Sequence, residues 1–196
     1  GITYGFPFSE FDRARLGINF ENVGFKLDST SAPPAFSDFE TENGNKFDVF
    51  KMEMGWSHNT RNRAIFASSG SLQSIDAELA VPGGELQYYK ASYRHLRYLP
   101  ITRNVNFAVD LEFAYGDGYQ DTETLPFFEN YFAGGERSVR GYRQNTLGPR
   151  SACAGCEPLA IGGNARFLGG LELQSPPPFT PDSKQVRFSL FMDSGT

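Results

Sequence analysis

Apolar and polar residues alternate along much of the chain, which is the pattern of β-strands with one apolar and one polar face. The clearest example is segment 104–115, in which every second position from Val105 to Tyr115 carries an apolar or aromatic side chain. An α-helix would place such residues three or four positions apart. We predict eight strands, at 2–8, 14–22, 47–57, 72–81, 86–98, 104–115, 166–174 and 186–193.

The lengths of these segments and of their connections favour a membrane barrel. Strands in soluble sheets average about 5–6 residues, whereas a tilted transmembrane strand needs about 9–11. Short or middling turns join the strands at one end, and two long connections, 25–46 and 117–164, lie at the other end with a tight Gly83-Gly84 turn. Outer-membrane barrels segregate short turns and long loops in this way. The predicted fold class is therefore all-β, an antiparallel transmembrane β-barrel segment; a soluble all-β binding module remains an alternative.

Net charge and hydropathy limit the kinds of partner and membrane segment that this chain can have. The formal net charge is -5 and no cluster of Lys and Arg occurs, which argues against nucleic acid as a partner. No stretch approaches the roughly 18 apolar residues of a membrane-spanning helix. The mean hydropathy of -0.41 is compatible with a barrel, because only every second residue of a strand faces lipid. Segment 117–164 is far longer than an ordinary connection. We expect it either to be disordered outside the barrel or to be ordered inside the lumen, and the second alternative requires a barrel wider than eight strands.

The long connection contains Val139-Arg140-Gly141-Tyr142 within a glycine-rich stretch that starts at Tyr131. This tetrad resembles the sixth-loop motif of the Omp85 superfamily, and most closely of its BamA-type assembly factors. Similar segments occur in the same order along the whole chain, at 4–7, 55–59, 81–84 and 191–196.

The resemblance implies that residues 1–196 form about strands six to thirteen of a larger barrel, without its POTRA domains, its first strands and its last strands, and that 117–164 is an extracellular loop inserted into the lumen. It implies a factor of the bacterial cell outer membrane that folds and inserts β-barrel proteins, with membrane lipid, unfolded barrel clients and accessory lipoproteins as partners. A two-partner secretion transporter of the same superfamily is the alternative. Neither reading requires an enzyme, a cofactor or a metal.

Arg140 is the central residue of the predicted loop latch, formed by Val139, Arg140, Gly141, Tyr142, Glu172 and Asp193. An arginine that enters the lumen loses hydration and needs anionic partners. Glu172 alternates with Leu171 and Leu173 along its strand, so its side chain belongs to the polar face. Asp193 follows the same rule on the neighbouring strand, and the resemblance assigns the same pairing. The sequence therefore predicts that Arg140 binds both carboxylates.

The remaining candidates lack the context of a catalytic or metal site. Cys153 and Cys156 follow the motif in the same connection, and a local disulfide is the simplest interpretation, with two reduced thiols as the alternative. His58 and His95 have no ligand at metal-site spacing, and we interpret them as rim or lumen residues. A sheet of this size on its own would have two unpaired edges, so we expect it either to close into a small eight-stranded barrel or to associate edge to edge.

Overall fold

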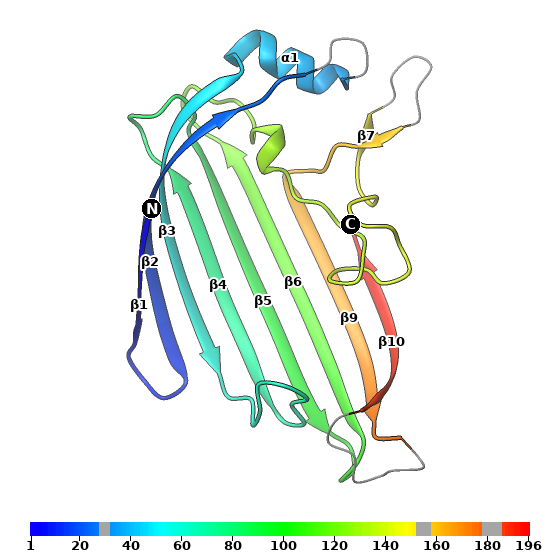
Figure 1. The fold of residues 1–196 in the computed structure, drawn as a ribbon. Helices are drawn as coiled ribbons and strands as arrows, with labels where there is room; N and C mark the ends of the chain where they lie inside the picture. The colour runs from blue at the N-terminus through cyan, green and yellow to red at the C-terminus, as the bar shows by residue number, and fades with distance from the viewer. Residues whose placement is uncertain (28–31, 152–157, 178–185) are drawn as a thin grey trace.

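Eight antiparallel strands form one curved sheet in the computed structural model, which describes residues 1–27, 32–151, 158–177 and 186–196 (Figure 1). The strands follow one another in the sheet in chain order, each hydrogen-bonded to the next. They are β1 (Ile2–Pro7), β2 (Asp12–Gly24), β3 (Lys46–Asn59), β4 (Gly70–Ala80), β5 (Tyr88–Pro100), β6 (Asn106–Gly118), β9 (Ala165–Ser175) and β10 (Phe188–Gly195).

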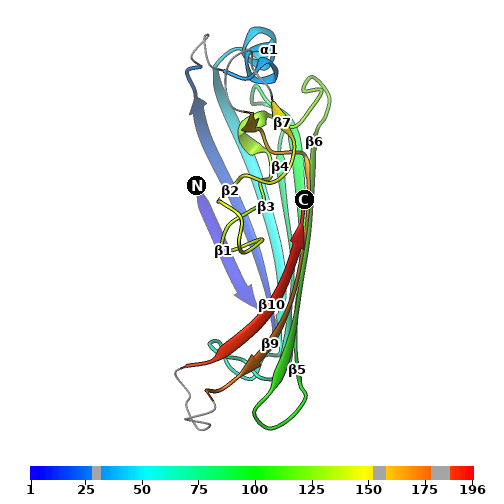
Figure 2. The ribbon, with the colours of Figure 1, turned by 90° about the vertical axis from the view of Figure 1, so that its right-hand side faces the viewer.

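The predicted eight-stranded antiparallel sheet is confirmed, with strand ends displaced by only a few residues. Closure into a small barrel was the wrong alternative, because β1 and β10 are the two edges of the described sheet and do not pair. The physical reason is space: side chains alone fill the interior of a closed eight-stranded barrel. Here the described parts of segment 119–164, which is called the long loop below, lie on the concave side of the sheet between its two edges (Figure 2).

The two faces of the sheet differ in chemistry. The outer face is apolar: Ile18 pairs with Met52, Met52 with Leu79 and Leu79 with Tyr89, so one row of apolar side chains crosses four strands. All four side chains are exposed, and Ile18 retains 65% of its accessible surface. The inner, concave face carries charged pairs instead, such as Arg94 on Asp110 at 2.6 Å. This alternation follows from the two-residue period of a strand.

The two ends of the sheet differ in the length of their connections. At the end called the turn end, residues 8–11, 60–69, 101–105 and 176–187 join consecutive strands. At the opposite loop end, residues 25–45, 81–87 and 119–164 do so. The long loop contains the 3-10 helix η1 (Phe127–Glu129) and the short paired strands β7 (Arg150–Ser151) and β8 (Leu159–Ala160).

Helix α1 (Pro34–Asn43), in the connection between β2 and β3, was not predicted. Pro34 stands in its first turn, where the missing N–H costs nothing, and Gly44 ends it at a φ of 91°. Its phenylalanines pack on η1: the ring centroids of Phe36 and Phe127 are 4.3 Å apart, and those of Phe39 and Phe127 are 5.5 Å apart. No helix in the described ranges is long and apolar enough to cross a membrane.

The largest buried cluster lies at the loop end, between the inner face and these two helices. Its buried side chains come from β3, β4, β5 and the connections 81–87 and 119–164: Phe47, Val49, Ala80, Leu86, Tyr88 and Leu125. Partly buried phenylalanines pack against them, among them Phe25, Phe39 and Phe128. Burial of aromatic side chains contributes strongly to stability, because each removes a large apolar area from water. The cluster therefore holds the start of the long loop against β3 and β5.

Candidate functional site

The tetrad of the long loop projects its arginine because the backbone turns sharply at glycines. Gly141, directly after Arg140, has a φ of 90°, and Gly134 has a φ of 105°. This region of φ is accessible to glycine and strained for other residues. A Cβ atom on Gly134 would lie 2.5 Å from the carbonyl oxygen of Arg143, so the turn also requires the absence of a side chain. The glycines of this stretch thus have a defined structural role.

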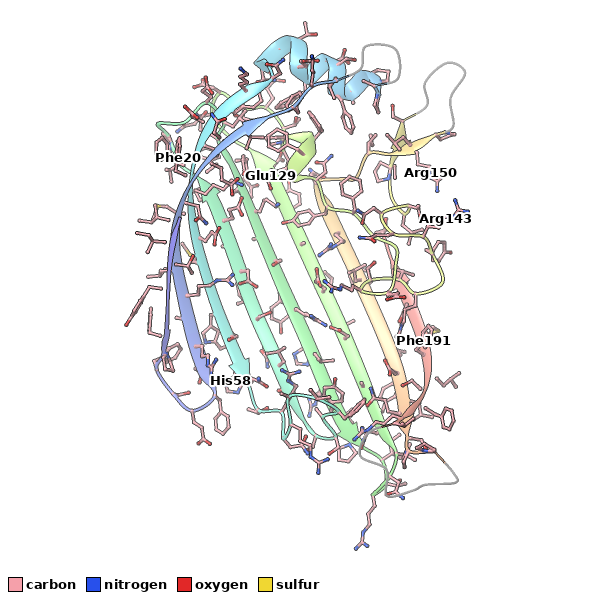
Figure 3. All side chains as sticks on the ribbon, in the orientation of Figure 1. Phe20, His58, Glu129, Arg143, Arg150 and Phe191 are labelled. Carbon is pink, nitrogen blue, oxygen red and sulfur yellow. The ribbon has the colours of Figure 1, made fainter. Side chains whose placement is uncertain are left out.

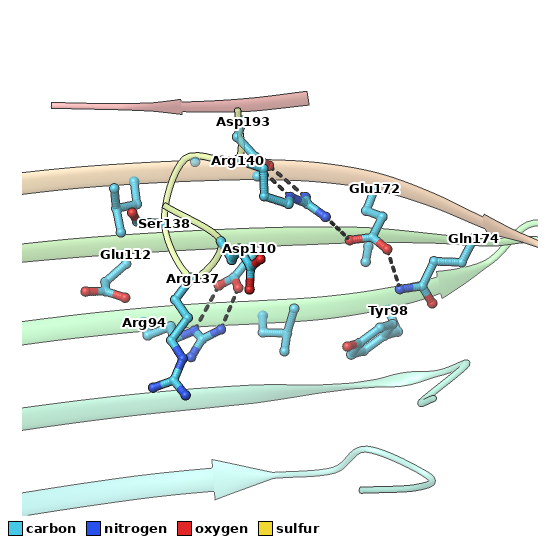
Figure 4. Close-up of a pocket in the computed structure, with 16 residues that line it drawn as sticks. Arg94, Tyr98, Asp110, Glu112, Arg137, Ser138, Arg140, Glu172, Gln174 and Asp193 are labelled. Atoms are coloured by element: carbon cyan, nitrogen blue, oxygen red, sulfur yellow. Dashed lines mark hydrogen bonds and ion pairs between the residues drawn. The ribbon is translucent and has the colours of Figure 1, made fainter. Parts of the chain in front are cut away.

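Arg140 binds both carboxylates on the inner face of the sheet (Figure 4). Its Nε and Nη2 donate to the two oxygens of Asp193 on β10, each at 2.7 Å, and Nη1 donates to Glu172 on β9 at 3.1 Å. The backbone N–H of Arg140 donates to Asp193 as well, at 2.9 Å. Such a bidentate, charge-assisted arrangement is among the stronger polar interactions in proteins. It fixes the position of the tetrad along β10.

Each partner of Arg140 is itself held in place. The Asp193 side chain is only 4% exposed, and the second oxygen of Glu172 accepts a hydrogen bond from Gln174 at 3.1 Å. The guanidinium carbon of Arg140 lies 3.6 Å from the centre of the Phe191 ring, which is a cation–π contact. The Asp193 hydrogen bond raises the pKa of Arg140, so the guanidinium is charged at any physiological pH.

The other residues of the tetrad contribute unequally. Val139 is 3% exposed and packs with Ala133 and Leu168, and thereby closes a small apolar cluster beneath the arginine. Tyr142, which we grouped with the latch, keeps more than half of its surface exposed, and its ring makes none of the contacts to Glu172 or Asp193. The structure therefore brings together Val139, Arg140, Glu172 and Asp193 around the turn at Gly141.

A second charged contact, which sequence reasoning missed, attaches the long loop to the opposite part of the sheet. Glu129 of η1 accepts hydrogen bonds from Lys51 on β3 at 2.8 Å and from Lys90 on β5 at 2.7 Å. The buried Tyr88 hydroxyl donates to Glu129 at 2.9 Å. Figure 3 shows Glu129 on the inner side of the sheet near the loop end. We call these four residues the Glu129 cluster.

The charges in and around the Glu129 cluster are nearly balanced. Lys51, of which 6% of the side chain is exposed, also pairs with Glu21 on β2 at 2.9 Å and approaches Glu78 on β4 to 3.5 Å. Burial alone would raise the pKa of Glu129, but the hydrogen bonds and charges of Lys51 and Lys90 outweigh it and lower the pKa. A buried charge is tolerated only with such partners. The only sequence signal was a lysine on the face that buries Phe47 and Val49.

The long loop is therefore tied to both sides of the curved sheet, by Glu129 to β3 and β5 and by Arg140 to β9 and β10. Between these attachments Arg166 of β9 pairs with Glu112 of β6 and donates to the backbone oxygen of Phe132 in the loop at 3.1 Å. A cavity of about 390 Å³ remains between loop and sheet, lined largely by polar and charged side chains (Figure 4). The described part of the loop thus covers the concave side near the loop end, and the part of the sheet toward the turn end stays uncovered (Figure 1).

Of the two interpretations of the histidines, the lumen is wrong and the rim agrees with the structure. His58 and His95 lie on the outer face near the turn end, in the row next to Trp56 and Tyr93, and not in the concave interior. Cys153 and Cys156 are outside the described residues. In the described ranges, no group of three or more His, Cys, Asp or Glu side chains is arranged to hold a metal ion.

Comparison with known proteins supplies the family. A family model described as the Omp85 superfamily domain matches residues 1–196. The chain belongs to the Omp85 superfamily. It is 33% identical over its whole length to the outer membrane protein assembly factor BamA of Neisseria meningitidis, and 26% identical over 99% of its length to a mouse homologue of sorting and assembly machinery component 50.

A solved structure of another Omp85 protein has the same fold as this chain. The crystal structure of BamA from Haemophilus ducreyi lacking POTRA domains 1–3 superposes with a TM-score of 0.88 over 99% of this chain, at 27% identity. The eight-stranded sheet thus has the form of part of the BamA barrel. The chain covers 26% of the Neisseria protein, 44% of the mouse protein and 40% of the chain in the Haemophilus structure.

Proposed function

We propose that this chain is a segment of the barrel domain of a bacterial outer-membrane β-barrel assembly factor, in which it supplies barrel wall and the loop latch. The observation that carries the proposal is the attachment of Arg140 to Asp193 and Glu172, in a chain that is related to BamA over its whole length. BamA of Neisseria meningitidis is by name an outer membrane protein assembly factor. The partners proposed here are membrane lipid, unfolded β-barrel clients and accessory lipoproteins.

The exposed apolar outer face supports placement of the sheet in a bilayer. Side chains such as Leu16, Ile18, Met52 and Leu190 are 45–74% exposed, although a soluble protein rarely leaves a contiguous apolar patch of this kind uncovered. A barrel strand instead meets lipid with one face and the wet interior with the other. In this placement the loop end is extracellular and the turn end is periplasmic, as in outer-membrane barrels with long outer loops.

The proposed mechanism involves no covalent chemistry. Backbone N–H and C=O groups of an unpaired strand are costly in hydrocarbon, and an insertion factor lowers that cost by offering partners at the membrane. The contribution of this segment is to keep the wall and the long loop in one arrangement. The loop bound at Glu129 and Arg140 restricts changes in curvature between β3 and β10, because it is attached near both.

Reconstitution of the complete protein in phospholipid vesicles tests this function. We expect several unrelated unfolded barrel proteins to insert and fold faster in its presence, as measured by protection from protease and by heat-modifiable migration in gels. Vesicles without the protein are the control. Failure to accelerate any barrel client, combined with passage of one passenger polypeptide through the protein, would contradict assembly and establish the transporter of the same superfamily instead.

A further inference from the structure

A polar patch interrupts the apolar outer face at the turn end of β3, β4 and β5. His58, Gln73 and His95 form one row across these strands, because His58 pairs with Gln73 and Gln73 with His95. In the next row toward the turn end Ser71 pairs with Arg97, and the Thr60 hydroxyl lies 3.2 Å from that of Ser71. We call this group the donor patch; its members are His58, Thr60, Ser71, Gln73, His95 and Arg97.

The donor patch offers hydrogen-bond donors and positive charge but few acceptor charges. Arg97 is exposed, and none of the hydrogen bonds or ion pairs between described residues involves its side chain. Its cross-strand neighbours are Ser71 and Val109, neither of which carries a charge. The carboxylate that contacts the patch is that of Asp12 on β2, at the edge farthest from Arg97. It already binds His58 at 2.9 Å and Ser9 at 2.6 Å. The Arg97 side of the patch therefore lacks an anion.

The position of the patch matches the level of lipid headgroups. Arg97 lies three residues before Pro100, the end of β5, which corresponds to about 10 Å along the strand. Toward the centre of the sheet, the row that follows His58, Gln73 and His95 consists of Trp56, Ile75 and Tyr93. Trp and Tyr are enriched where a barrel crosses the boundary between hydrocarbon and headgroups. An arginine on the turn-end side of such a row can reach phosphate, whereas its charge would be strongly destabilising at the bilayer centre.

We propose that the donor patch binds the phosphate of an anionic phospholipid in the leaflet next to the turn end, with Arg97 as its principal cation. This inference rests on the proposed function, because it requires the outer face to lie in a bilayer. The guanidinium supplies the charge and a fork of donors for phosphate oxygens. The Ser71 and Thr60 hydroxyls and the Gln73 amide supply neutral donors beside it.

The test measures lipid selectivity in the complete protein. Spin-labelled phosphatidylglycerol and phosphatidylcholine are introduced separately, and the motionally restricted fraction of each gives its relative affinity for the protein surface. Since one basic residue near a membrane surface contributes about 1 kcal/mol, we expect Arg97→Gln to lower the preference for phosphatidylglycerol about fivefold. Arg103→Gln is the matched control, because Arg103 is an exposed arginine in the 101–105 turn and is not part of the patch. Its effect should be less than twofold.

The other outcomes separate the two proposals. Equal effects of Arg97→Gln and Arg103→Gln would overturn the donor patch, provided that phosphatidylcholine shows a restricted fraction. Absence of a restricted fraction for either lipid would instead overturn the proposed membrane placement. Soluble glycerol phosphate, compared with chloride at equal ionic strength, distinguishes a free anion from a lipid. If glycerol phosphate binds to the wild-type protein and not to Arg97→Gln, while Arg97→Gln leaves the lipid preference unchanged, the patch binds free phosphate and the lipid assignment is wrong. Arg97→Lys, which keeps the charge, should retain part of the selectivity.

Discussion

Replacement of Arg140 by alanine is expected to detach the long loop from β9 and β10 and to lower client insertion roughly tenfold or more, since 1.4 kcal/mol already changes an equilibrium tenfold. Removal of the guanidinium leaves Asp193, 4% exposed, without its main partner. Loss of one member of a buried pair costs about 3–5 kcal/mol, and we expect about 2–3 kcal/mol here because the Arg140 side chain is 30% exposed. Initial rates of client folding in vesicles provide the measurement.

Arg143→Ala is the matched control for Arg140→Ala. Arg143 lies three residues further along the same loop, is exposed, and makes no ion pair with any described residue. Its replacement should leave insertion rates within experimental error. Exchange of the charges, Arg140→Glu combined with Asp193→Arg, should recover part of the activity lost in either single variant. Single variants without effect, together with a double variant that restores nothing, would refute the latch.

Loss of the Glu129 carboxylate is expected to release the start of the long loop from the sheet. Glu129→Ala removes the ion-pair partner of Lys90 and one of the partners of the buried Lys51. We expect a loss of about 2–3 kcal/mol in local stability, because two lysines then lose a charged partner and Lys51 stays buried. Amide hydrogen exchange in residues 127–131 should accelerate accordingly, while exchange in β9 changes little.

Glu123→Ala provides the comparison for this variant. Glu123 is in the same loop, is exposed, and makes no ion pair among the described residues. Equal exchange rates at 127–131 in the two variants would show that the Glu129 cluster does not hold the loop.

The Glu129 cluster also predicts a dependence on pH. Because the pKa of Glu129 is lowered in the folded protein, its contribution to stability is complete above the ordinary pKa of glutamate and is lost as the pH falls through the lowered value. The wild-type Tm should therefore decrease in this acidic range by more than the Tm of Glu129→Gln, which carries no charge to neutralise. Parallel decreases in the two proteins would contradict the assignment.

Sequence reasoning located the Arg140 contact because each part of it is encoded locally. The alternation in 166–174 and 186–193 determines the face of Glu172 and Asp193, and the glycines around Arg140 indicate a bend. Strands β9 and β10 are consecutive in the chain and pair with each other, so the order of the strands alone makes the two carboxylates neighbours. The role of this contact in assembly is a proposal that the Arg140 variants test.

The Glu129 cluster and the donor patch depend on information that periodicity does not contain. Glu129 meets Lys51 and Lys90 from positions 78 and 39 residues away, through the packing of α1 and η1 on β3. Strand β5 carries polar residues on both faces, so the alternation of its sequence does not determine which face holds His95. The face follows only from the register of β5 with β4, in which His95 pairs with Gln73. Tertiary packing and register therefore determine both features.

The most direct test of whether the outer face meets hydrocarbon uses nitroxide probes placed one at a time at Ile18 and Asn19. It measures how often each probe collides with oxygen and with a water-soluble nickel complex. The two residues are adjacent on β2 and therefore lie at nearly the same depth, but they point to opposite faces. In the complete protein in vesicles, we predict that the probe at Ile18 collides mainly with oxygen and the probe at Asn19 mainly with the nickel complex. Access of the nickel complex to Ile18, with the probe at Asn19 shielded from it, would contradict the account.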